Sequence, residues 1–248
     1  MSEYDLTVAI TAHNEALVAG PSMLSVEAAI GVIEREGLRV ERVIGLDNPT
    51  PEAEAFFRRE TLSRWRVDEF AFGDPFRVRN AMVRAGRGKW IAFVDADDLV
   101  SENWLLRGAQ RLRIAEQAGE RIIVHPELNW IFEAHQNVFA KPDMNDDIFL
   151  PHYLYFANYY DMMAIAPREA ALEIPYGDRD LKNGFGFQDW QWNIETMGAG
   201  WRHVVVKDTV IFKRRRLNSV SEVNRDRRCL IRDVEAMAID RVLLLGQR

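Results

Sequence analysis

Short apolar segments alternate with longer amphipathic ones along the first half of the chain. Four segments have the continuous apolar, β-branched character of strands buried on both faces, at 6–11, 39–46, 67–72 and 90–94. Each is followed by an amphipathic segment with helix-start or helix-stop residues, at 22–36, 51–65, 76–85 and 101–117. These four repeats predict an α/β fold with a doubly wound, mostly parallel sheet flanked by helices.

The second half has a less regular pattern. Residues 122–138 predict strands or a long ordered loop, and residues 201–212 predict one or two further strands. A helix is predicted at 189–197, after a glycine-rich turn, and a long amphipathic helix at 221–245. No repeat or linker-like stretch interrupts the chain, so we expect a single domain.

The composition is that of an ordinary globular protein, with 48% hydrophobic and 28% charged residues among 248. The single cysteine, Cys229, excludes an intramolecular disulfide and argues against a cysteine-based metal site. The longest apolar runs, 91–94 and 242–245, are far shorter than the roughly 20 residues of a membrane-spanning helix. Acidic Glu3 and Asp5 stand where a signal peptide is basic, so we expect a cytoplasmic protein.

The net charge of −6 is distributed unevenly. Segment 213–232 carries eight basic and two acidic side chains, a net charge of +6, and residues 233–248 contribute −1, which leaves −11 for residues 1–212. An acidic body argues against nucleic-acid binding, which needs a broad basic surface. The basic segment suits a local anion site, or a peripheral contact with acidic lipid headgroups on the inner face of a membrane.

Polar loops follow three of the predicted strands, after Thr11, at Asp47 and at 95–98. Ligands bind outside the carboxyl ends of strands in open α/β sheets, so we expect a site there. Asp95, Asp97 and Asp98 place three carboxylates within four residues. Mg²⁺ or Mn²⁺ would relieve their repulsion, since these ions prefer carboxylates and substrate phosphates. Alternatively the carboxylates only favour the start of the next helix, by roughly 0.3–1 kcal/mol.

Five motifs resemble, in order, those of family 2 glycosyltransferases, and together they span residues 6–221. They are the opening strand with its Asn–Glu loop at 8–15, Asp47, the Arg79–Asn80 pair with the strand leading to 95–98, Gln188-Asp189-Trp190, and Arg215–Ser221. Two positions depart from the family pattern. Asn48-Pro49-Thr50 replaces a Ser/Thr-rich continuation, and Arg216 stands where the family often has a histidine.

The resemblance implies a single GT-A-type domain, 1–248, that moves a sugar with inversion from a nucleoside-diphosphate sugar to an acceptor hydroxyl. Residues 1–118 would form the nucleotide-sugar-binding half, 119–221 the acceptor and catalytic half, and 222–248 a C-terminal helix. A UDP-sugar donor is the default expectation. The resemblance also suggests a glycan or lipid-linked acceptor, in surface polysaccharide or glycoconjugate synthesis.

The resemblance also implies a role for each motif residue. Asp189 would be the general base, its pKa raised by burial among aromatic neighbours. Asp97 and Asp98 would hold Mn²⁺ or Mg²⁺, which would neutralise the leaving diphosphate. The residues expected to contact the nucleotide sugar are Thr11, Ala12, Glu15, Asp47, Arg79, Asp95, Asp97 and Arg216. Arg216 cannot ligate a cation, but it can bind phosphate directly.

Three other interpretations of the chain stay open. A haloacid-dehalogenase-type phosphatase has a similar strand and Asp-x-Asp motif but carries it near its N-terminus, whereas three predicted strands come first here. A sugar nucleotidyltransferase needs a glycine-rich loop after the first strand, which 12–15 is not. A non-catalytic carbohydrate-binding or scaffold protein of the same fold would not need carboxylates at both 95–98 and 189.

Each candidate residue also has an ordinary structural interpretation. Asp189 could cap the helix that follows it, and Arg216 could lie on an exposed strand without a ligand. The aromatic residues between 130 and 160 could either stack on acceptor sugars or pack in the core.

Overall fold

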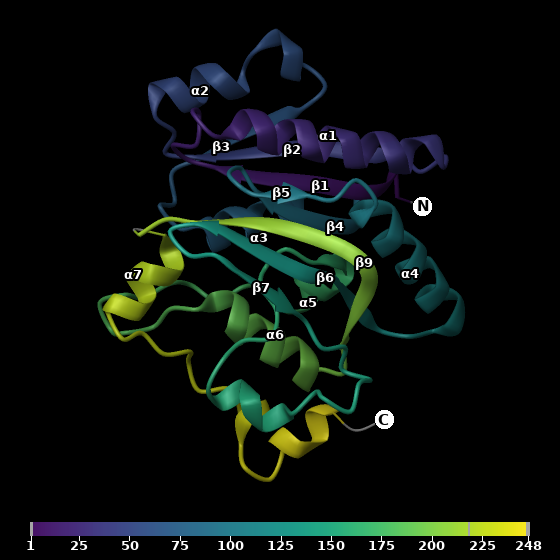
Figure 1. Cartoon of the computed structure of the whole chain (residues 1–248), viewed down its shortest axis with the longest axis vertical. Helices are drawn as coiled ribbons and strands as arrows, with labels where there is room; N and C mark the ends of the chain where they lie inside the picture. Colours follow the sequence, from purple (N-terminus) through teal and green to yellow (C-terminus); the bar gives the residue numbers. More distant parts are fainter. Residues whose placement is uncertain (1, 218, 247–248) are drawn as a thin grey trace.

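The computed structural model describes residues 2–217 and 219–246 (Figure 1). Within these residues, nine strands form one sheet with the order β3-β2-β1-β4-β8-β6-β9-β5, and β7 pairs with β6. The strands are β1 Tyr4–Ala12, β2 Val40–Asp47, β3 Arg66–Phe70, β4 Gly88–Asp95, β5 Leu99–Val100, β6 Ile122–Glu133, β7 Asn137–Ala140, β8 Ile165–Pro167 and β9 Arg202–Arg215.

Helices cover both faces of this sheet. The α-helices are α1 Ala19–Arg35, α2 Pro51–Phe57, α3 Pro75–Ala85, α4 Trp104–Ala118, α5 Arg168–Glu173, α6 Gln188–Gly198 and α7 Val220–Asp226. Short 3-10 helices lie at Glu60–Leu62, Pro151–Tyr155, Glu235–Met237 and Val242–Gly246. Helices α1 and α4 contact each other, and α3 contacts α5 (Figure 1). The predicted α/β class with a mostly parallel sheet and flanking helices is therefore confirmed.

The strand register brings the predicted polar loops to one edge of the sheet. Strands β2 and β4 run parallel to β1 on its two sides, and Thr11 stands opposite both Gly45 and Asp95. The second half adds antiparallel β8 and the long parallel pair β6 and β9. Because the carboxyl ends of β1, β2 and β4 coincide, the first loop, Asp47 and the Asp95–Asp98 loop face the same space.

Two apolar clusters hold these layers together. The larger cluster packs β1, β2 and β4 against α1, α3 and α4. In the smaller cluster, Ile194 and Met197 of α6 pack with Leu154, Tyr160 and Val242, which lies near the C-terminus. The C-terminal segment thus closes the second half of the chain over the back of α6.

The long C-terminal helix predicted within 222–248 is wrong. Helix α7 ends at Asp226, and Arg228 adopts a left-handed backbone conformation with φ of 52°. The chain then pairs with the loop before α6, since the N–H of Gly186 donates to the carbonyl of Leu230 at 3.0 Å. Some of the apolar positions that suggested a helix, Val234, Val242 and Leu245, are instead buried in the smaller cluster, while others stay exposed. Residues 247–248 lie outside the described residues.

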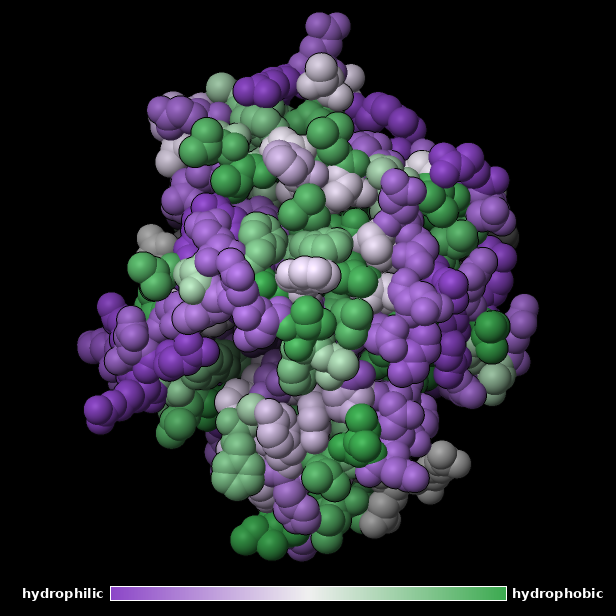
Figure 2. Space-filling view, viewed as in Figure 1, coloured by the Kyte–Doolittle hydropathy of each residue, from purple (hydrophilic) through white to green (hydrophobic). Residues whose placement is uncertain are grey.

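The surface differs between the two ends of the second half. Figure 2 shows hydrophilic side chains projecting where α7 lies, and hydrophobic ones where the C-terminal segment lies. The exposed apolar residues of that segment are Ile239, Leu243 and Leu244. No helix in the described part of the chain is long and apolar enough to cross a membrane.

Candidate active site

A cavity of about 760 Å³ opens at the carboxyl ends of β1, β2 and β4. The loop 156–162, the start of α6, the end of β9 and α7 line its other walls. Every residue predicted to bind nucleotide sugar or metal, or to act as the base, lines this cavity, namely Thr11, Ala12, Glu15, Asp47, Arg79, Asp95, Asp97, Asp98, Asp189 and Arg216. The fold therefore brings both predicted halves of the site together. Asn218, within the Arg215–Ser221 motif, lies outside the described residues.

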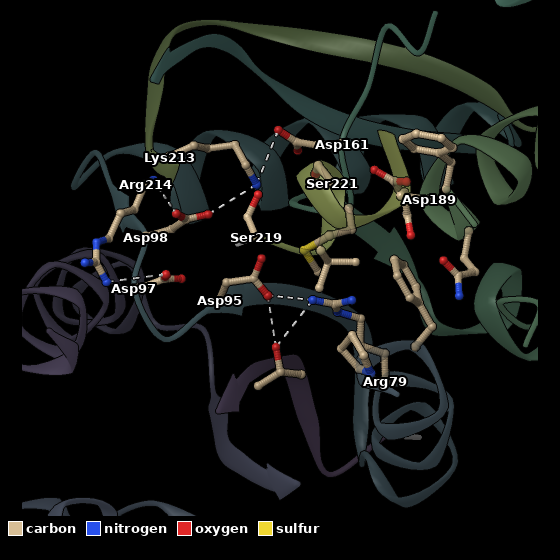
Figure 3. A pocket seen from close by; sticks show the side chains of 18 of the residues that line it. Arg79, Asp95, Asp97, Asp98, Asp161, Asp189, Lys213, Arg214, Ser219 and Ser221 are labelled. Atoms are coloured by element: carbon tan, nitrogen blue, oxygen red, sulfur yellow. Dashed lines mark hydrogen bonds and ion pairs between the residues drawn. The ribbon is translucent and has the colours of Figure 1, made fainter. Parts of the chain in front are cut away.

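Asp95 is held by two side chains from neighbouring elements (Figure 3). The hydroxyl of Thr11 donates to its Oδ1 at 3.0 Å, and Arg79 Nη2 donates to the same oxygen at 2.5 Å. Burial opposes ionisation of Asp95, but Arg79 and Lys213 outweigh it and lower the pKa. The side chain of Arg79 is only 4% exposed and lies over the ring of Phe76. This carboxylate is therefore charged and fixed at the bottom of the cavity.

Asp97 faces arginines that enter from the end of β9. Arg216 Nη2 lies 3.3 Å and Arg214 Nη1 lies 3.9 Å from Asp97 Oδ2. Arg216 Nη2 also lies 3.6 Å from Glu15 Oε1, while Glu15 Oε2 accepts the backbone N–H of His13. Burial, together with repulsion from the other two aspartates, raises the pKa of Asp97 to about 7. Among the described residues, the side-chain partners of Asp97 are therefore arginines, and an approaching cation or ligand would meet this carboxylate and these guanidinium groups together.

Asp98 is bound more completely than Asp97. Its Oδ1 accepts the N–H of Arg214 at 2.7 Å, and its Oδ2 lies 3.2 Å from Lys213 Nζ. Burial, partly offset by Lys213, raises the pKa of Asp98 to about 6. Asp98 was predicted to ligate a metal, but both carboxylate oxygens already have partners, and they tie the loop to β9.

The donor set suits a metal only in part. No group of three or more His, Cys, Asp or Glu side chains within the described ranges could hold an ion by itself. Mg²⁺ commonly uses one or two carboxylates and completes its shell with phosphates and water. Asp97 is the carboxylate of the loop that fits such a partial site.

Asp47 fixes a backbone loop at the end of the cavity where the nucleotide is expected to bind. Its Oδ1 accepts the N–H groups of Phe72 and Gly73 at 2.7 and 3.1 Å, and its Oδ2 accepts that of Asp74 at 3.1 Å. These bonds fix the loop that leads into α3. Asn48 Nδ2 donates a fourth hydrogen bond to Oδ1 at 3.4 Å. A carboxylate can accept about four hydrogen bonds, so the chain itself occupies most of the acceptor capacity of Asp47.

Asp189 lies across the cavity from Asp97 and Asp98 (Figure 3). It stands in the first turn of α6, two residues after Phe187, whose φ of 57° gives the residue before the helix a left-handed conformation. Burial raises the pKa of Asp189. The helix start thus presents a carboxylate of raised basicity to the second half of the cavity.

Sequence reasoning missed a buried charge cluster that joins both sides. Asp161 receives a hydrogen bond from Asn129 Nδ2 at 2.6 Å and lies 3.4 Å from Lys141 Nζ and 3.8 Å from Lys213 Nζ. Burial lowers the pKa of Lys141 to about 8, whereas for Lys213 the carboxylates around it outweigh burial and raise the pKa. Side chains alternate between the two faces of a strand, so Lys213 points to the same buried face as Ile211, two residues earlier in β9. This alternation could have predicted that Lys213 is buried.

A chain of buried polar side chains lies behind this cluster. His125 Nε2 and His203 Nδ1 are 2.8 Å apart, and His203 Nε2 lies 2.9 Å from the hydroxyl of Thr196 on α6. The ring of Tyr160 stacks on His125 at 4.2 Å between centroids. Burial lowers the pKa of His203 to about 3 and that of His125 well below its usual value. Both rings are therefore neutral at pH 7 and tie α6 to β6 and β9.

The aromatic residues predicted for the acceptor side divide into two groups. Tyr159 and Tyr160 line the cavity and are also buried in the smaller apolar cluster. Trp130, Tyr153 and Tyr155 are partly exposed outside it.

With this geometry in place, the sequence comparison decides the family. Residues 7–160 match the model of the family "Glycosyl transferase family 2". The chain belongs to glycosyl transferase family 2. No curated protein matches this glycosyltransferase. The match includes the loop 95–98 and so favours a transferase over the phosphatase interpretation.

Solved structures of low sequence identity share the fold of this glycosyltransferase. S. aureus TarS 1–349 in complex with UDP-GlcNAc superposes with a TM-score of 0.65 at 14% identity, covering 88% of this chain and 60% of that one. The mannosyltransferase PcManGT from Pyrobaculum calidifontis, in complex with GDP-Man and Mn²⁺, gives 0.58 at 15% identity, covering 85% and 56%. This glycosyltransferase thus spans less than two thirds of either solved chain.

Proposed function

We propose that this glycosyltransferase moves a sugar, with inversion, from a nucleoside-diphosphate sugar to an acceptor hydroxyl. The observation that carries the proposal is the single cavity in which Asp189 faces the arginine-lined loop 95–98 (Figure 3). TarS and PcManGT were solved with UDP-GlcNAc and GDP-Man, which supports a nucleotide-sugar donor. A UDP-sugar is the first donor to test.

The diphosphate would bind between the end of β9 and the loop 95–98. Arg214 and Arg216 have side chains 18% and 30% exposed, and both reach the cavity. Guanidinium groups bind phosphate through paired N–H donors, and a charged phosphate would compete with Asp97 for them. Thr11, Ala12 and Asp47, with the captured loop 72–74, would line the nucleoside end.

A divalent ion would be held by Asp97 together with the diphosphate oxygens. When bound, Mn²⁺ or Mg²⁺ supplies Lewis-acid stabilisation of the leaving diphosphate. Asp98 would act indirectly, because its bonds to Lys213 and Arg214 fix the loop that carries Asp97.

Asp189 would remove the proton from the acceptor hydroxyl as that oxygen attacks the anomeric carbon. A single displacement inverts the configuration at that carbon, as in inverting glycosidases. An aspartate of ordinary pKa near 3.9 is a weak base at pH 7, and the raised pKa of Asp189 improves the match. The chain's own contribution is thus a base on one wall and fixed cations on the other.

The acceptor is a glycan or lipid-linked glycan in this proposal, and the basic segment would contact acidic lipid headgroups. The structure divides that segment, because Lys213, Arg214 and Arg216 turn into the cavity. Lipid contact would rest on exposed residues near α7 that do not line the cavity, among them Leu217, Arg227, Arg228 and Leu230.

The first experiment is a thermal-shift screen of UDP, GDP, CDP and dTDP, each with Mn²⁺, Mg²⁺ or EDTA. Binding to the native state at a hundredfold excess over Kd adds about 2.7 kcal/mol of stability, which is an easily measured shift. A shift with one nucleotide supports the proposal, and its loss in EDTA supports the metal. No shift with any nucleotide contradicts the proposal. Release of free nucleotide from the matching nucleotide sugar without acceptor then separates an enzyme from a scaffold.

A further inference from the structure

Gln188, the residue before Asp189, is buried without using its amide group. The side chain lines the cavity, and the residue is only 2% exposed. Neither its Nε2 nor its Oε1 has a hydrogen-bond partner among the residues that the structure describes. A buried amide atom without a partner costs about 1–3 kcal/mol, so the folded chain carries a local destabilisation here.

Two neighbours on the same wall also have unused polar atoms. Trp190 Nε1 and Asn224 Oδ1 are buried, line the cavity, and lack a partner within the described ranges. Asn224 belongs to α7, whose packing is tight at this point, because a Cβ on Gly186 would lie 2.7 Å from the Asn224 side chain. The start of α6 and α7 therefore form one wall that carries several unpaired groups.

The types of these atoms restrict the ligand that could complete them. Gln188 offers one donor and one acceptor, Trp190 offers a donor, and Asn224 offers an acceptor. A phosphate only accepts hydrogen bonds and an ammonium group only donates them, so each would leave half of the wall unpaired. A sugar hydroxyl does both. The rings of Phe187 and Trp190, 6.0 Å apart, add an aromatic surface beside these groups.

We infer that Gln188, Trp190 and Asn224 form a recognition site for a neutral, hydroxyl-bearing sugar ring next to Asp189. This inference rests on the proposed function and adds the class of sugar and the residues that select it. Either the donor's sugar or the acceptor's terminal sugar supplies that chemistry. Gln188 is thus a specificity-determining residue whose hydrogen bonds are completed only when substrate binds.

The decisive variant is Gln188→Met, which keeps the length of the side chain and removes both polar atoms. Thermal unfolding without ligand should show an unchanged or higher Tm, because an unpaired amide has been removed. Calorimetry with UDP, UDP-GlcNAc and UDP-glucose should show an unchanged Kd for UDP. If the donor supplies the sugar, the extra affinity that the sugar adds over UDP should fall roughly tenfold.

Gln191→Met is the matched control on the same helix. Gln191 is also buried, but its Nε2 donates to Glu195 at 2.8 Å and its Oε1 accepts the N–H of Arg232 at 3.3 Å. It does not line the cavity. This variant should lower the Tm and leave sugar affinity unchanged, so the two glutamines should respond in opposite ways.

The two sources of sugar give different results for Gln188→Met. A loss of affinity for the nucleotide sugar, together with weaker discrimination among UDP-sugars, assigns the site to the donor. Unchanged donor affinity with a raised KM for the acceptor assigns it to the acceptor. A lowered Tm with both affinities unchanged overturns the inference. If wild-type protein binds no nucleotide, the proposed function fails, whereas the Tm comparison still tests whether the amide is unpaired.

Discussion

The two sides of the cavity position their charged groups by different means. On the first side, Asp47 and Asp95 stand at the ends of buried parallel strands, and sheet topology alone brings them together. On the second side, charges lie within the protein, as Lys213 does in β9 and Lys141 beside Asp161, and each is held by an opposite charge. Backbone N–H groups satisfy Asp47, and Thr11 and Arg79 satisfy Asp95, whereas the buried charges of the second side depend on one another. The first side is therefore specified locally and the second cooperatively.

The largest effect should come from Asp189→Asn, which removes the chemistry of the second side and leaves the first side intact. The amide cannot accept the acceptor proton, so the rate of transfer should fall by roughly 10²–10⁴-fold. The Kd of UDP should stay the same in calorimetry. Parallel loss of activity and UDP binding would contradict the role of Asp189 as base.

Lys213→Met tests whether the second side depends on mutual pairing. Without the ammonium group, Asp98 and Asp161 lose a partner in a buried setting, and the free energy of unfolding should fall by about 3–5 kcal/mol in urea titrations. Lys89→Met is the control, because Lys89 pairs with Glu116 at the surface and an exposed pair contributes under about 1 kcal/mol. Equal effects of the two substitutions would remove the distinction between the two sides.

Asp98→Ala and Asp97→Ala compare neighbours within the loop. Loss of Asp98 leaves the N–H of Arg214 and the ammonium of Lys213 without that partner and should reduce stability by roughly 1–3 kcal/mol. Asp97→Ala should reduce stability less and abolish the Mn²⁺-dependent part of UDP binding. The reverse pattern, measured by urea titration and calorimetry, would make Asp98 the metal residue.

A pH titration of stability should reveal the buried histidines. The pKa of His203 is lowered to about 3 in the folded state and is near 6.5 when unfolded, so its contribution is complete above pH 6.5. As the pH falls below 6.5 the unfolded state gains protons first, and stability should fall by about 1.4 kcal/mol per pH unit for this residue.

His203→Gln should remove the contribution of His203 and leave that of His125, whose pKa is also lowered, whereas exposed His152→Gln should retain the full slope. The raised pKa values of Asp97 and Asp98 act in the opposite sense, since they favour the folded state at lower pH, but all three proteins share that term. Identical pH dependence of the wild type and His203→Gln would show that His203 is not held neutral.

The smallest effect is expected for Arg216→Ala, directly after β9, which reaches across to Asp97 and Glu15 on the first side. Loss of a partly exposed guanidinium should weaken UDP binding by about tenfold, the equivalent of roughly 1.4 kcal/mol. Arg107→Ala, on the outer surface of α4, is the control. UDP affinity equal to that of the wild type would show that Arg216 forms ion pairs with Asp97 and Glu15 and does not bind the diphosphate.

The same comparison explains what could be predicted from the sequence. The first four strands and their loops follow hydrophobic runs, so the positions of Thr11, Asp47 and the loop 95–98 could be predicted. Asp161 and Lys141 could not, because a buried charge interrupts the apolar pattern and its partner lies far away in the sequence. The C-terminal helix was overpredicted because apolar spacing near 3.6 residues also fits turns that pack against α6.

The buried position of Lys213 constrains how the sequence can evolve. It meets Asp98 from one half of the sequence and Asp161 from the other, so neither half can alter its charge alone. A lineage that replaces Lys213 by a neutral residue should carry compensating substitutions at both aspartates. A chimera that joins the first half of this chain to the second half of a distant relative should fold only when the incoming segment supplies a matching cation.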